Sequence, residues 1–343
     1  MFLDTYSIEK INIEQRRYIG NKNKLKEWIM GLIFENCPDC NSFIDIFSGT
    51  GVIAKEAINH YDKIIINDFL YSNNTIYKAF FGTGKVNHKL LVDTINNYNN
   101  INSNYLKNNY FSDNFGDKFF NNKDATKIGY IREDIERKKS LYSEKEYNIL
   151  LASIIYSMDK IANTVGHYDA YIKKEIKNKD FKYQLINYYS YDKVDIYKED
   201  ANILIEKIEG DILYVDPPYN SRQYSRFYHI YENLVKWGKP ELYGVAKKPL
   251  PENMSDYCRT SAKDAFKHLI ENANSKYIVV SYNNTYNSKS SSSENKITYE
   301  QLFSILSAKG KTKVFESKYK AFNTGKTDFA DHKELLFITK NND

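Results

Sequence analysis

Residues 42–58 read SFIDIFSGTGVIAKEAI, and this stretch decides the fold. The apolar run 42–47 has the length of a buried strand and stops at a turn that contains two glycines. The residues after the turn, 52–58, read as a helix. A second apolar run, KIIIND at 63–68, predicts another buried strand that ends in a carboxylate. Strand, helix and strand at this spacing indicate a βαβ unit with a parallel sheet.

The rest of the chain continues this alternation after one long interruption. Further strands are predicted at 212–215, 277–282, 313–317 and 334–339, and a helix near 299–308. Alternating strands and helices predict an α/β fold with a doubly wound, mostly parallel, Rossmann-like sheet. The Ser-rich stretch 288–293 predicts a flexible loop.

The interruption, residues 75–199, predicts an insertion outside the core sheet. It contains many Asn, Tyr and Lys, few Gly, and one clear apolar helix near 147–161. We therefore expect a core built from residues 1–74 and 200–343, with 75–199 forming an inserted subdomain.

The composition is that of an ordinary globular protein. Of 343 residues, 42% are hydrophobic and 27% charged, and the net charge is +5. We find no apolar run that could span a bilayer and no secretion signal, so we expect a cytoplasmic protein. Lys and Arg cluster near 16–26, 132–139, 173–182 and 222–248, among Asn, Tyr and Gln that can bond phosphate or stack on bases. On composition alone, an ordinary solvated surface explains these clusters.

The three cysteines, Cys37, Cys40 and Cys258, are too few for a disulfide framework. Cys37 and Cys40 have the C-x-x-C spacing of redox and half-zinc motifs. No second Cys or His pair completes a zinc site in the sequence, so we expect no metal.

The glycine turn has the pattern of a nucleotide site. Gly49, Gly51 and Ala54 fit the loose G-x-G-x-x-A fingerprint, in which glycines let a ligand approach the backbone. Asp68, at the end of the second predicted strand, can accept hydrogen bonds from ribose hydroxyls. Such a match is weak by itself. It indicates an adenosine-containing cofactor and leaves both NAD and S-adenosylmethionine open.

The stretch Asp216-Pro217-Pro218-Tyr219 directly follows the predicted strand 212–215. Sheets of this kind place their ligands at the carboxyl ends of strands. The prolines hold a rigid backbone without N–H donors, so the carbonyl of Pro217 can accept a bond. Asp216 and that carbonyl can accept both N–H bonds of an amine, which makes its nitrogen nucleophilic. Tyr219 offers a flat face for an extruded base.

With these motifs, the chain resembles the adenine-N6-specific DNA methyltransferases of the Dam-like group, and within it the modification methylases of the FokI type. Four blocks carry the resemblance: RYIGNK at 17–22, DIFSGTG at 45–51, DKIANTVGHY at 159–168 and DPPYNSRQY at 216–224. The resemblance covers most of the chain from residue 16 to about 340 and is weak between 75 and 145. It implies a class I S-adenosylmethionine-dependent methyltransferase fold, with target recognition in the insertion.

The resemblance also implies the site residues. The cofactor S-adenosylmethionine would contact Tyr18, Lys22, Asp45, Phe47, Gly49, Gly51, Asp68 and Asp200. Lys22 would approach the carboxylate of its methionine part, which is a sensible charge pair. Asp200 would bind its adenine, although a helix cap before 201–204 explains Asp200 equally well. Asp216, Pro217, Pro218 and Tyr219 would form the catalytic motif.

The expected function is site-specific methylation of the N6 amine of an adenine flipped out of duplex DNA. The enzyme would be the modification component of a restriction–modification system, with a cognate restriction endonuclease as a partner. The nearest alternative is a methyltransferase of ribosomal RNA, against which the N-terminal block and the long insertion argue. A nucleic-acid-binding protein with an inactive methyltransferase fold is a second alternative, disfavoured by the intact Asp216 and glycine turn. An NAD enzyme leaves the Asp-Pro-Pro-Tyr block unexplained.

Overall fold

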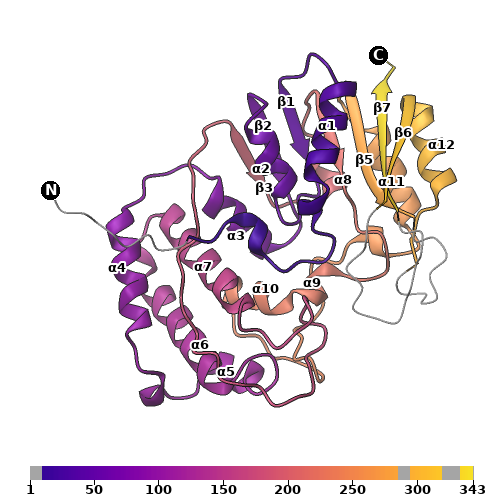
Figure 1. Ribbon diagram of the computed structural model, residues 1–343. Helices are drawn as coiled ribbons and strands as arrows, with labels where there is room; N and C mark the ends of the chain where they lie inside the picture. The colour runs from indigo at the N-terminus through magenta and orange to yellow at the C-terminus, as the bar shows by residue number, and fades with distance from the viewer. Residues whose placement is uncertain (1–9, 285–293, 319–332, 343) are drawn as a thin grey trace.

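The computed structural model describes residues 10–284, 294–318 and 333–342, and Figure 1 shows a sheet part beside a mainly helical part. The predicted loop 288–293 lies outside the described residues. The sheet has the strand order β3-β2-β1-β4-β5-β7-β6. Its strands are β1 (Ser42–Asp45), β2 (Lys63–Asn67), β3 (Val194–Tyr197), β4 (Ile212–Val215), β5 (Tyr277–Asn283), β6 (Gly310–Lys318) and β7 (Lys333–Asn341).

The pairing of the strands confirms the predicted doubly wound, mostly parallel sheet. The neighbours from β3 to β5 are all parallel, with Phe43 of β1 beside Ile64 of β2 and Ile212 of β4. Strand β7 is reversed and runs antiparallel to its neighbours, β5 and β6. Consequently the first residues of β7 lie at the edge of the sheet where the parallel strands end.

Helices cover both faces of the sheet, which explains why the central strands are apolar throughout. On β4, Ile212 and Tyr214 pack with α1 (Lys26–Asn36) and α2 (Val52–Ile58), whereas Leu213 and Val215 face the other side. The helices on that other side are α8 (Ala201–Leu204), α11 (Ala262–Glu271) and α12 (Tyr299–Lys309).

The helical part lies beyond the edge of the sheet where the parallel strands end (Figure 1). Its helices are α3 (Tyr71–Phe80), α4 (His88–Asn99), α5 (Tyr110–Phe115), α6 (Asn122–Arg137), α7 (Glu144–Asp159), α9 (Tyr224–Phe227) and α10 (His229–Lys236). Helix α7 is buried along most of its length and confirms the predicted apolar helix. No helix in the described part of the chain is long and apolar enough to cross a membrane.

The boundaries of the insertion differ from the prediction. Strand β3 lies inside the range 75–199, yet it pairs with β2 and forms an edge of the core sheet. Helix α3 runs across the predicted start of the insertion. The apolar core is also continuous, because Phe111 of α5 belongs to the same buried cluster as Ile64 of β2. The side chain of Glu232, on α10, accepts the backbone N–H groups of Tyr71 and Ser72 at the start of α3. The helical part is therefore packed into the core.

The two cysteines of the C-x-x-C motif are free thiols. Burial raises the pKa of Cys37 to about 12 and that of Cys40 to about 11. Since the thiolate is the reactive and metal-binding form, this environment favours a packing role for both residues.

Candidate active site

A single pocket at the carboxyl ends of β1, β2 and β4 collects almost all of the predicted site residues. It is lined by Tyr18, Lys22, Asp45, Phe47, Gly49, Asp68, Asp200, Asp216, Pro217, Pro218 and Tyr219, among others. Gly51 is the exception among the predicted set. It caps α2 behind the turn with φ 76°, where an added Cβ would lie 3.0 Å from Ile13 and 3.1 Å from Tyr77. Gly51 thus allows the turn to pack closely.

Asp68 holds the glycine turn against the end of β2. Its Oδ2 accepts the backbone N–H of Gly49 at 3.1 Å, and its Oδ1 accepts that of Leu70 at 2.8 Å. The hydroxyl of Tyr77 donates to the carbonyl of Gly49 at 2.7 Å. Burial raises the pKa of Asp68. Each carboxylate oxygen has two acceptor sites, so Asp68 can still accept bonds from a ligand.

Asp45 is a buried carboxylate whose oxygens have no hydrogen-bond partner among the described residues. Its side chain is 1% exposed, and burial raises its pKa well above the usual range, with the nearby Asp216 adding to the effect. A buried carboxylate without a partner is costly. Because Asp45 lines the pocket, this position fits a ligand that brings a cationic or N–H group.

Two further predicted residues frame the pocket. The side chain of Asp200 accepts the backbone N–H of Asn202 at 2.9 Å and so caps α8, and it also lines the pocket. The helix-cap explanation of Asp200 is therefore confirmed, and a cofactor role remains compatible with it. The ring of Phe47 meets that of Tyr257 edge to face, with centroids 4.9 Å apart. Tyr257 was not predicted from the sequence.

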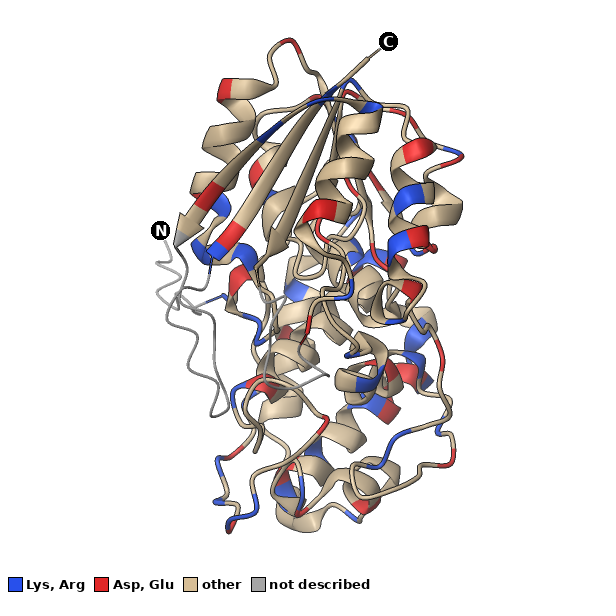
Figure 2. Cartoon of the chain, turned by 90° about the vertical axis from the view of Figure 1, so that its right-hand side faces the viewer, with Lys and Arg blue, Asp and Glu red and all other residues tan. Residues whose placement is uncertain are grey.

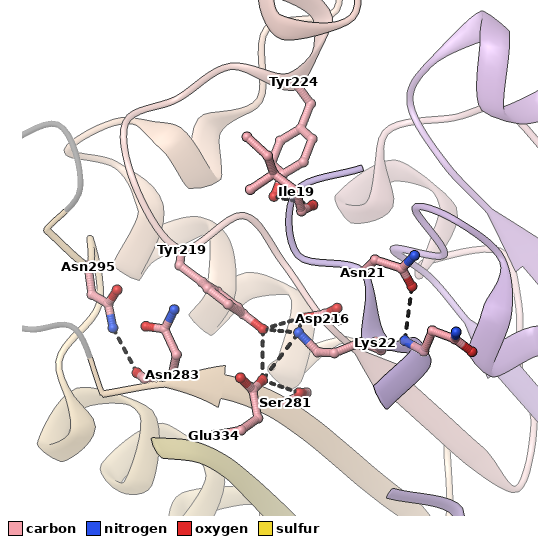
Figure 3. Close-up of polar contacts among 11 residues, drawn as sticks. Ile19, Asn21, Lys22, Asp216, Tyr219, Tyr224, Ser281, Asn283, Asn295 and Glu334 are labelled. Atoms are coloured by element: carbon pink, nitrogen blue, oxygen red, sulfur yellow. Dashed lines mark hydrogen bonds and ion pairs between the residues drawn. The ribbon is translucent and has the colours of Figure 1, made fainter. Parts of the chain in front are cut away.

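The Asp-Pro-Pro-Tyr loop is tied to two residues from distant parts of the chain (Figure 3). Nζ of Lys22 lies 2.9 Å from Oδ1 of Asp216 and 3.2 Å from Oε1 of Glu334. The hydroxyl of Tyr219 lies 2.5 Å from Oδ1 of Asp216 and 3.0 Å from Oε1 of Glu334, and it accepts a bond from Lys22. The sequence predicted that Lys22 approaches the cofactor. In the structure, its ammonium group pairs with Asp216 and Glu334.

This cluster has a defined charge pattern. Burial alone would lower the pKa of Lys22, but Asp216 and Glu334 outweigh it and raise that pKa. Burial raises the pKa of Asp216, Lys22 opposes the rise, and the charge of Glu334 adds to it. Lys22 is thus a firmly charged cation that favours the ionised form of Asp216.

The 159–168 block serves mainly as packing between the helical part and the N-terminal segment. The hydroxyl of Tyr168 donates to Oδ1 of Asp159 at 3.1 Å, and that of Tyr231 donates to the same oxygen. Beside them, the ring of Tyr18 stacks on Tyr228 with centroids 4.4 Å apart. Tyr18 therefore lies between this packed layer and the pocket.

The order of the strands, with β7 reversed next to β5, is that of the class I S-adenosylmethionine-dependent methyltransferases. A model of the D12 class N6 adenine-specific DNA methyltransferases matches residues 18–314, and the chain belongs to this family. The predicted family and fold are thereby confirmed.

Three characterised relatives show how the chain compares in length. It is 33% identical to the type II methyltransferase M.FokI of Planomicrobium okeanokoites, over 94% of this chain and 52% of that protein. It is 29% identical to M.NlaIII of Neisseria lactamica, over 92% of this chain and 95% of that one. It is 32% identical to M.CviAII of Paramecium bursaria Chlorella virus 1, over 89% of this chain and 92% of that one. The chain thus spans about half of the FokI relative and nearly all of the other two.

Proposed function

We propose that this chain transfers a methyl group from S-adenosylmethionine to the N6 amine of adenine in duplex DNA. One observation carries the proposal: Asp216 lines the same pocket as the glycine turn, Asp45 and Asp68. An amine bound by Asp216 would therefore lie beside a cofactor bound at the turn. The family supports adenine and DNA as the substrate.

The names of the relatives, type II methyltransferases, support a role in restriction–modification. A cognate restriction endonuclease as partner and a cytoplasmic location stay predictions.

The residues of the pocket suit the parts of this cofactor. Asp45 would accept the methionine ammonium group, Asp68 the ribose hydroxyls, and Asp200 the adenine amine. The bound cofactor supplies a methyl group on a positively charged sulfur, which is already activated for attack. The protein therefore needs chiefly to position the two reactants and exclude water.

The catalytic loop would bind the target base. Asp216 and the carbonyl of Pro217 would accept the two N–H bonds of the amine and orient its lone pair. Tyr219 would stack on the flipped adenine. Since β4 ends directly before Asp216, the rigid sheet fixes the position of the acceptor.

The function is tested by incubating the protein and S-adenosylmethionine with a pool of duplex DNA, and separately with ribosomal RNA. The nucleosides are then identified by mass spectrometry. We expect N6-methyladenine in the DNA. Methylation of RNA alone, or of cytosine in DNA, would contradict the proposal.

Replacing Asp68 by alanine should weaken the binding of S-adenosylmethionine. The change removes a charged acceptor and also releases the backbone N–H of Gly49. We expect a loss on the order of 1–3 kcal/mol, measured by calorimetry. Asp68→Asn is the matched control, because its amide oxygen retains one acceptor and should lose less. Unchanged affinity in a folded Asp68→Ala variant would rule out this assignment.

We also propose that α4–α6 and the segment 160–182, which follows the buried helix α7, hold the target-recognition region. Part of this segment lies beside the chain that leaves the catalytic loop. The backbone N–H of Tyr168 donates to the carbonyl of Phe227 at 2.8 Å, and the ring of His167 stacks on that of Phe227 with centroids 4.7 Å apart. Figure 2 shows Lys and Arg on loops of the helical part.

Exposed lysines of this segment should contribute to DNA affinity through phosphate contacts. Lys173, Lys174 and Lys177 are all exposed. Replacing the three by glutamine should weaken binding and reduce the slope of log affinity against log salt by up to about 3, because fewer counterions are released. Fluorescence anisotropy with labelled duplex at several KCl concentrations measures both quantities.

The matched control removes three exposed lysines from the edge of the sheet where the parallel strands begin, opposite the edge that carries the pocket. Lys63 begins β2, and Lys311 and Lys340 are paired near the far ends of β6 and β7. Their replacement by glutamine should leave the salt dependence nearly unchanged. Equal effects of the two triple variants would place the DNA-binding surface elsewhere.

A further inference from the structure

Glu334 is a buried carboxylate at the start of an apolar strand. It is 3% exposed, and the four residues after it, 335–338, form part of the apolar core. Because β7 runs antiparallel to β5, Glu334 pairs with Asn283 at the edge of the sheet where β4 also ends. The reversed strand thus brings a second carboxylate to the catalytic loop.

The contacts of Glu334 are concentrated on the catalytic loop and its lysine (Figure 3). Its Oε1 lies 3.0 Å from the hydroxyl of Tyr219 and 3.2 Å from Nζ of Lys22, and it accepts the hydroxyl of Ser281 at 2.7 Å. A buried carboxylate is tolerated when it is paired and hydrogen-bonded in this way. Glu334 therefore pairs with Lys22, and it shares with Asp216 the one proton that the Tyr219 hydroxyl can donate.

Those two groups both bind the same oxygen of Asp216. Lys22 and Tyr219 contact Oδ1, at 2.9 and 2.5 Å. Two donors on one oxygen restrict how the carboxylate can turn, and they leave its second oxygen available to a substrate. In the described structure, both groups that contact Oδ1 of Asp216 also lie within 3.2 Å of Glu334.

We propose that Glu334 is a positioning residue for methyl transfer, which holds Lys22 and Tyr219 against Oδ1 of Asp216 so that Oδ2 faces the target amine. The inference rests on the proposed function for its link to catalysis. Glu334 is not among the residues that line the pocket. It acts from β7 through the ammonium and hydroxyl groups that it binds.

Several charged or titratable groups surround Asp216. They are Lys22 from the N-terminal segment, Glu334 from β7, Asp45 from β1, Asp68 after β2, Tyr214 from β4, Tyr219 from the loop itself and Tyr224 from α9. Lys22 lowers the pKa of Asp216 and Glu334 raises it. Removing the charge of Lys22 should therefore raise the pKa of Asp216, and removing the charge of Glu334 should lower it.

The test compares Glu334→Gln with the wild-type protein. The amide retains the size of the side chain and can still accept bonds, but it removes the charge. We expect single-turnover methyl transfer to fall at least about tenfold, while the affinities for S-adenosylmethionine and DNA change less than about threefold. Asp216 must be ionised to accept the amine, so activity is lost as the pH falls through its pKa. The acid limb of the pH–rate profile should move to lower pH in Glu334→Gln and to higher pH in Lys22→Met.

Glu316→Gln is the matched control, because Glu316 lies on β6, is about half exposed and pairs with Lys333. It should leave both the rate and the pH profile unchanged. A carbon-13 NMR titration of the aspartate carboxyls, assigned with Asp216→Asn, measures the same pKa without any substrate. The Asp216 signal should titrate at lower pH in Glu334→Gln.

These measurements separate the inference from the proposed function. If the wild-type protein forms no N6-methyladenine, the function fails, and the NMR titration still decides whether Glu334 controls Asp216. A folded Glu334→Gln variant with the wild-type rate and an unmoved Asp216 titration would overturn the inference. A lower rate with an unchanged pH profile would indicate that Glu334 has only a structural role. That result would also overturn the inference.

Discussion

Replacing Asp216 by alanine should reduce single-turnover methyl transfer by at least about 100-fold, because the amine loses the acceptor that orients it. Cofactor affinity should change little, since Asp45 and Asp68 lie at the ends of other strands. The variant should also fold. Without Asp216, Lys22 retains Glu334 as its ion-pair partner, so no buried charge is left alone.

The measurement is rapid quench of a duplex that carries a known target, with the nucleosides identified by mass spectrometry. Calorimetry reports cofactor binding on the same preparations. Asp216→Asn is the control, because its amide oxygen can still accept a bond without a charge, and its loss should be smaller. A wild-type rate in Asp216→Ala would refute the catalytic role of the loop.

Replacing Tyr219 by alanine should produce the second large effect. Stacking of a base on an aromatic ring contributes about 1–3 kcal/mol. The change also removes the hydroxyl that contacts Asp216 and Glu334, so both the binding of the flipped base and the orientation of the acceptor should suffer. We expect methyl transfer to fall about 10- to 100-fold, with a weaker fluorescence rise from 2-aminopurine placed at the target position.

Tyr219→Phe separates the ring from the hydroxyl. From the sequence alone, only the ring has a role, and phenylalanine would be nearly fully active. In the structure the hydroxyl contacts Asp216, Glu334 and Lys22, so its removal should cost about 1 kcal/mol, or about fivefold in rate. The 2-aminopurine signal should stay near that of the wild type. A loss as large as that of Tyr219→Ala would contradict the stacking role.

The sequence predicted the central fold well because its signals are local. The runs that form β1, β2 and β4 are apolar on both faces and stop at a glycine, a carboxylate or a proline. Strand β3 was missed because it lies at an edge, where only Val194 of its four residues is buried. Helix α4 was missed because Asp, Thr and Asn residues lie between Leu91, Ile95 and Tyr98 and obscure the apolar stripe.

The site was predicted where it follows contiguous motifs. The glycine turn and the Asp-Pro-Pro-Tyr loop can each be identified from a short sequence motif. Both follow parallel strands, whose carboxyl ends lie at the same edge of the sheet. No sequence motif surrounds Glu334, because a glutamate at the start of a strand is common. Glu334 lies beside Lys22 and Asp216 because β7 is reversed. The contact between Glu334 and Lys22 joins residues 312 positions apart in the sequence, so only the folded structure reveals it.

The continuous core between the sheet and the helical part limits how this enzyme could acquire a new target sequence. Helices α3, α7 and α10 pack together, and Glu232 of α10 caps the start of α3. Exchanging the whole of residues 75–199 with a relative would transplant β3 and α7 and cut through α3, which disrupts the scaffold of the catalytic loop. Grafts confined to α4–α6 and the segment after α7 leave that scaffold intact. Variation in specificity should therefore accumulate as changes on these outer elements, while the three inner helices are inherited with the catalytic core.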